Sequence, residues 1–116
     1  MDVSAGSAQR FDLGIERFLK GDTLTCDRVV FWKDPKGRLC VYSYSDFHEP
    51  ANFTATEAQE KIDRSKRILA DLSAKSPAFA AVATQLPHRY EFCNDYGMGS
   101  VMLAWEENGD FTWRGL

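Results

Sequence analysis

Apolar residues recur at three- and four-residue steps in three stretches of the chain, which is the spacing of one face of a helix. The first stretch begins after Ser7, whose hydroxyl can cap a helix, and stops at Gly21, which suits the position after a helix end. Gly14 inside it lowers helix propensity by about 1 kcal/mol relative to Ala and predicts close packing against a neighbour. The last stretch opens with Ser76-Pro77. This pair suits the start of a helix, because Pro is well tolerated in a first helical turn.

The central stretch carries the clearest helix start. Thr54-x-x-Glu57 matches a capping box, in which the two side chains accept hydrogen bonds from backbone N–H groups of the first turn. The apolar stripe that follows has a single polar position, Ser65. Its apolar members are Ala58, Ile62, Leu69 and Leu72. The pattern predicts a long helix with this stripe in the core.

Alternation of apolar and polar positions, typical of strands, occupies two other regions. The segments 28–33 and 38–44 flank Asp34-Pro-Lys-Gly37, a sequence that suits a turn, and so predict a hairpin. Residues 90–114 contain three aromatic-rich runs, separated by Gly97-Met-Gly99 and by Asn108-Gly109. Because Asn-Gly tolerates the positive φ angles of a tight hairpin, this region predicts a three-stranded antiparallel meander.

These elements follow the order α-β-β-α-α-β-β-β. The predicted fold is α+β: a five-stranded antiparallel sheet, flat or curved, formed by the N-terminal hairpin and the C-terminal meander, with the helices packed on one face. A chain of 116 residues fits one domain. We place this domain at residues 7–116, after a disordered tail at residues 1–6.

Both faces of the predicted sheet carry large apolar side chains, whereas a half-exposed antiparallel sheet usually alternates apolar and polar. Val29 and Phe31 point to one side, and Val30 and Trp32 to the other. One layer of helices covers one face, so the other would expose a larger apolar patch than soluble monomers tolerate. Three arrangements stay open: the sheet curls around a ligand pocket, a second copy covers the patch, or the aromatic residues simply decorate an exposed sheet.

The candidate binding residues are strand aromatics and one amide. Asn94 shares a predicted face with Tyr90, and a buried amide needs a hydrogen-bond partner, which either the backbone or a ligand can supply. The six candidates are Tyr42, Tyr44, Tyr90, Phe92, Asn94 and Tyr96.

Charge and motifs narrow the function classes. A net charge of −3 without a basic stripe argues against nucleic acid as a partner, and no stretch reaches the roughly 18 apolar residues of a membrane span. Three cysteines without Cys-x-x-Cys spacing, and no signal-peptide pattern, indicate a reducing, cytoplasmic location. His48 and His88 lack the paired spacing of a zinc site, and Gly97-Met-Gly99 leads into a strand, unlike a dinucleotide motif. The sequence therefore predicts no metal and no cofactor.

The sequence favours a non-enzymatic binding module. Its aromatic-rich sheet face would form a pocket for a small apolar ligand, or a surface for a second copy or another protein. The alternative is a small enzyme in which Asp46, His48 or Glu91 acts as acid or base in an aromatic-lined pocket. Such a role requires burial beside apolar groups, because desolvation brings a carboxyl pKa closer to neutrality.

Overall fold

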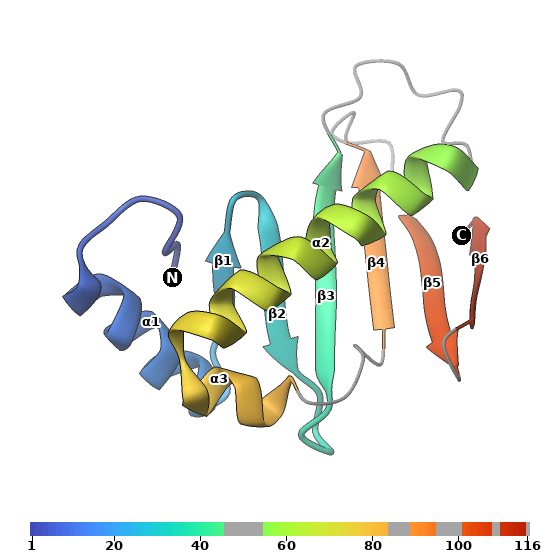
Figure 1. Ribbon diagram of the computed structural model, residues 1–116. Helices are drawn as coiled ribbons and strands as arrows, with labels where there is room; N and C mark the ends of the chain where they lie inside the picture. Colours follow the sequence, from blue (N-terminus) through green and yellow to red (C-terminus); the bar gives the residue numbers. More distant parts are fainter. Residues whose placement is uncertain (46–54, 84–88, 95–100, 108–109, 116) are drawn as a thin grey trace.

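The computed structural model describes residues 1–45, 55–83, 89–94, 101–107 and 110–115 of the chain (Figure 1). The helices in these residues are α1 (Ala8–Leu19), α2 (Ala55–Lys75) and α3 (Pro77–Val82). The strands are β1 (Leu24–Cys26), β2 (Val29–Lys33), β3 (Leu39–Ser45), β4 (Arg89–Asn94), β5 (Val101–Glu107) and β6 (Asp110–Gly115). The chain is therefore α+β, as predicted.

The sheet is mixed, with six described strands in the order β1-β2-β3-β4-β5-β6. β3 and β4 run parallel, and the other neighbours run antiparallel. The prediction of five antiparallel strands in the order α-β-β-α-α-β-β-β was wrong in strand number and at the β3–β4 junction. The chain segment that holds α2 and α3 connects these two strands, and a helical crossover of this kind lets the next strand enter in the same direction.

The strand missed by sequence analysis is β1, which has three residues. The turn from β1 to β2 is made by Asp27 and Arg28, whose φ angles are +52° and +68°. Tight hairpin turns need such positive φ angles. In a sequence, a turn of this kind is recognised by Asn-Gly or a similar pair, which is absent here. A turn without Gly and a strand too short to show alternation left no pattern to detect.

The segment predicted to be a disordered tail, residues 1–6, lies beside β1. The Val3 N–H donates to the Thr25 carbonyl and the Thr25 N–H donates to the Met1 carbonyl, each at 2.8 Å. Val3 also packs over α1 at Gly14, where an added Cβ would come within 2.5 Å of a Val3 methyl carbon. The close packing predicted for Gly14 is confirmed, and the N-terminal segment is the neighbour that needs the space.

Two helices begin at their predicted caps. The Ser7 hydroxyl accepts a backbone N–H of the first turn of α1 at 3.2 Å, and the Ser76 hydroxyl accepts the Phe79 N–H at 3.1 Å. Each bond satisfies one of the four N–H groups that a helix start leaves unpaired. Thr54, the predicted cap of α2, lies outside the described residues.

The three helices pack against one face of the sheet, where they form the core (Figure 1). Its buried members are Ile15, Phe18, Leu24, Val29, Phe31, Leu39, Val41, Ile62, Leu72, Phe79 and Tyr90. The Phe79 ring lies 5.3 Å from that of Phe18 and 5.8 Å, edge-on, from that of Phe31, and these contacts join α3, α1 and β2. Ser65, the polar position in the α2 stripe, is buried and donates its hydroxyl to the Lys61 carbonyl at 2.9 Å.

Candidate functional site

The sheet face away from the helices is built by alternate residues of β1 to β4. Cross-strand partners share a face, so the register groups the residues of this face into two neighbouring rows. One row is Thr25, Val30 and Tyr42, and the other is Trp32, Cys40 and Arg89. We name these six residues the open face.

Most side chains of the open face are partly exposed. Val30, Trp32 and Tyr42 are half-buried, whereas Phe31, the neighbour of Trp32 on the other side, has no exposed surface. Cys40, between Trp32 and Arg89 in its row, is 2% exposed. Cys40 is therefore covered, whereas Val30, Trp32 and Tyr42 keep part of their surface exposed on the outside.

The structure does not bring the six predicted site residues onto one surface. Tyr42 lies on the open face, but Tyr90 is fully buried on the helix-covered side. The parallel register pairs Tyr90 with Val41, a core residue. Tyr90 therefore lies on the sheet face that is opposite to the face of Tyr42. Sequence alternation alone cannot detect this, because it fixes faces within one strand and not between strands.

The remaining predicted site residues are placed only by their position in the chain. Phe92 and Asn94 stand in β4 and Tyr44 stands in β3, all three in the parallel pair of strands. Tyr96 lies outside the described residues. Their role in binding stays a prediction.

The three acid-base candidates are not gathered into a site by the described residues. Asp46 and His48 lie outside them, and Glu91 stands in β4 at the register position of Tyr42. No group of three His, Cys, Asp or Glu residues suited to a metal ion occurs in the described part of the chain. The enzyme alternative stays a prediction.

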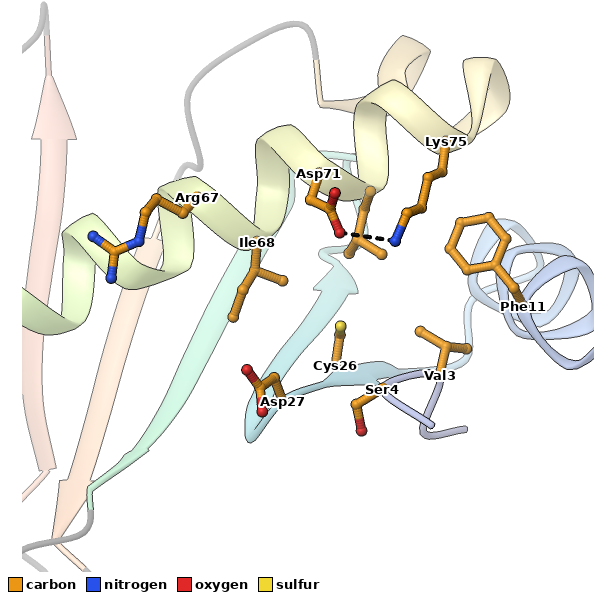
Figure 2. A pocket seen from close by; sticks show the side chains of 10 residues that line it. Val3, Ser4, Phe11, Cys26, Asp27, Arg67, Ile68, Asp71 and Lys75 are labelled. Carbon is orange, nitrogen blue, oxygen red and sulfur yellow. Dashed lines mark hydrogen bonds and ion pairs between the residues drawn. The ribbon is translucent and has the colours of Figure 1, made fainter. Parts of the chain in front are cut away.

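A groove of about 380 Å³ is a second candidate site, and sequence analysis missed it (Figure 2). It lies between the N-terminal segment, α1, the end of β1 and the C-terminal half of α2. Its apolar lining is Val3, Phe11, Ile68 and Leu72. A neighbouring hollow along α1 shares Val3, Ser4, Phe11 and Lys75 with it, so the groove continues over the start of that helix. The groove exists because the N-terminal segment lies beside β1, where Val3 and Ser4 form one of its walls.

Two polar groups of the groove, on Lys75 and Cys26, are paired or held neutral. The Lys75 ammonium lies 3.0 Å from the Asp71 carboxylate, as drawn in Figure 2, but both side chains are largely exposed and such pairs stabilise little. Burial, aided by the nearby Asp27 carboxylate, raises the pKa of the Cys26 thiol. Because the thiolate is the reactive form, Cys26 is a poor nucleophile at neutral pH. The groove therefore offers an apolar floor and a charged rim without an activated group on Cys26.

No protein family matches this chain, and comparisons with curated proteins and with solved structures found no significant match. None of the described helices is long and apolar enough to cross a membrane.

Proposed function

We propose that this protein is a non-enzymatic binding module that recognises another protein through its open face. The observation that carries the proposal is the grouping of Trp32, Tyr42 and Arg89 on a sheet face that lies away from the described helices (Figure 1). Trp, Tyr and Arg are the residue types that most often dominate the binding free energy of protein interfaces.

The packing within the open face supports this proposal. Trp32 and Tyr42 extend from adjacent, paired strands and are already half-buried by their neighbours. Side chains held in this way lose little rotamer entropy when a partner docks, so more of the contact energy appears as affinity. The rows of Val30, Trp32 and Tyr42 are mainly apolar, and so the partner we propose is a folded protein with an apolar surface patch.

Site-specific photocrosslinking tests this proposal in cells. A photoreactive phenylalanine analogue is placed at position 42, and in a control protein at Leu13, an exposed apolar residue of α1. We expect a defined covalent adduct with another protein from position 42 and none from position 13. Equal adducts from both positions would contradict a specific role of the open face.

The affinity of the captured partner provides the quantitative test. Trp32→Ala should weaken binding by at least about 10-fold, as expected for an interface hot spot, while Leu13→Ala should not change it. Thermal unfolding of both variants checks that the fold is kept. Unchanged affinity of Trp32→Ala would refute the proposal, because Trp32 is the largest side chain of the open face.

Small-ligand binding in the groove is a second candidate function. The specific support is its volume of about 380 Å³ together with its apolar floor, both typical of ligand sites. The fluorescent probe anilinonaphthalene sulfonate should bind saturably, and Ile68→Asp should weaken its binding about 10-fold, whereas the matched change Leu13→Asp should not. A probe signal that ignores Ile68→Asp would exclude the groove.

A further inference from the structure

The two edge strands of the sheet, β1 and β6, differ in whether a described segment pairs with their outer edge. At one end, residues 1–3 hydrogen-bond along the outer edge of β1 through Thr25. At the other end, β6 has six residues and pairs with β5 alone among the described strands. A strand edge of this length carries backbone donors and acceptors that suit pairing with another strand.

The sequence of β6 is complementary to itself when two copies run antiparallel. With Thr112 opposite its own counterpart, Asp110 stands opposite Arg114, and Phe111 stands opposite Trp113. Each of these matches occurs twice because of the two-fold symmetry. Opposite charges and aromatic pairs are the cross-strand partners that stabilise antiparallel sheets. Shifting the register by one or two residues in either direction leaves both charged residues opposite uncharged ones.

The register inside the chain adds an independent reason. β5 and β6 pair Glu107 with Asp110, so two acidic residues occupy directly opposite register positions of the hairpin. Like charges in directly opposite positions destabilise a strand pair. An arginine from a second copy, placed on the other side of Asp110, would offset this repulsion.

We propose that β6 pairs antiparallel with β6 of a second copy and forms a two-fold symmetric dimer with one continuous sheet. The symmetry axis of such a pair stands perpendicular to the sheet, between the two copies of Thr112. Both sets of helices then lie on one side, and the two open faces lie together on the other. The dimer uses the sheet edge, so it does not depend on whether the open face binds a partner.

Charge reversal tests this dimer on the full chain. Asp110→Arg alone and Arg114→Asp alone each place like charges opposite each other twice in a homodimer, and each should weaken self-association about 10-fold or more at low salt. An equimolar mixture of the two variants restores both opposite-charge pairs in a heterodimer. Sedimentation velocity over a range of concentrations should therefore show wild-type dimers, weakened single variants and a recovered dimer in the mixture.

Two further variants keep the test decisive. The double variant Asp110→Arg/Arg114→Asp exchanges the charges within the strand and should dimerise as the wild type does, even if a single variant folds poorly. Asp12→Arg, at an exposed position of α1, changes the net charge as Asp110→Arg does and should leave self-association unchanged. Circular dichroism of each variant verifies the fold.

Three results would overturn the inference. The first is a wild-type chain that stays monomeric up to about 1 mM, a concentration at which even weak edge pairing is populated. The second is a dimer that neither single reversal weakens, or that the mixture does not recover. The third is a dimer that Trp32→Glu dissociates and the edge variants do not, which would assign the contact to the open face instead.

Discussion

The two faces of the sheet have similar residues but different environments. Phe31 and Trp32 are adjacent in β2, yet Phe31 has no exposed surface and Trp32 is half-buried. The same contrast separates Val41 from Tyr42 in β3. The described helices pack on one face, so an apolar side chain of β2 or β3 is fully buried or partly exposed according to its parity in the strand. Apolar content alone did not distinguish the face that the helices cover from the open face.

The largest expected change in the free energy of unfolding follows a substitution on the sheet face that the helices cover. Phe31→Ala removes a ring that packs edge-on against Phe79 and should lower the free energy of unfolding by about 3–5 kcal/mol, since it leaves a cavity in the core. Urea denaturation followed by circular dichroism measures this change. A loss near that of a surface substitution would show that the helices do not cover this face.

Trp32→Ala, one residue along the chain, should cost about 1 kcal/mol, because the ring already contacts solvent and its loss creates no closed cavity. The same urea titration, at a protein concentration below any self-association, gives the value. If Trp32→Ala destabilises the monomer as much as Phe31→Ala does, the two faces are equivalent and the contrast fails.

A substitution at Ser43 tests whether a buried polar group on the helix-covered face lowers the free energy of unfolding. Its hydroxyl is fully buried and has no hydrogen-bond partner among the described residues. Ser43→Ala should therefore change the free energy of unfolding by about 0–1 kcal/mol in the stabilising direction. Ser65→Ala is the matched control, because that buried hydroxyl is already bonded. A clear destabilisation by Ser43→Ala would reveal a partner for the hydroxyl.

The smallest expected effect on stability comes from Asp34, which lies in the turn that sets the β2–β3 register. Desolvation opposes ionisation of its carboxylate, but hydrogen bonds from the Arg38 backbone and guanidinium, and from the Lys36 N–H, outweigh it and lower the pKa. A lowered pKa means that stability is present above the ordinary carboxyl pKa and is lost as pH falls through the lowered value.

Asp34→Asn should therefore lower the melting temperature at pH 7, and the difference from wild type should shrink in acid. Melting curves between pH 7 and pH 2 measure this, with Asp12→Asn, an exposed carboxylate of α1, as the control. A gap between Asp34→Asn and wild type that stays constant across this range would show that the turn hydrogen bonds do not depend on the charge.

Much of the fold could be predicted from the sequence, because helix caps, turn residues and apolar spacing are local features. Ser7 and Ser76 cap the helices as predicted, and the Asp34-Pro-Lys-Gly37 turn joins β2 to β3, with Gly37 at a φ of +79°. The α2 stripe was predicted from its spacing, and Ile62 and Leu72 are in the core. The hairpins of β4, β5 and β6 also follow the predicted meander.

The candidate binding residues come from more than one face of the sheet. Tyr42 and Tyr90 were both predicted to take part in binding, and the structure places them on opposite faces because β4 joins β3 in parallel at the Val41–Tyr90 register. The groove beside Phe11 was not predicted, because it depends on the pairing of residues 1–3 with β1. Neither feature leaves a periodic or capping signal in the chain.

The sequence by itself determined all the described elements except β1, because helix caps, turn residues and apolar periodicity act between residues a few positions apart. It also determined which residues share a face within each strand. The tertiary structure alone decided which faces of different strands coincide, which edge the N-terminal segment covers and which side the helices occupy. These depend on pairing between distant segments, where a shift of one residue moves every side chain of a strand to the opposite face.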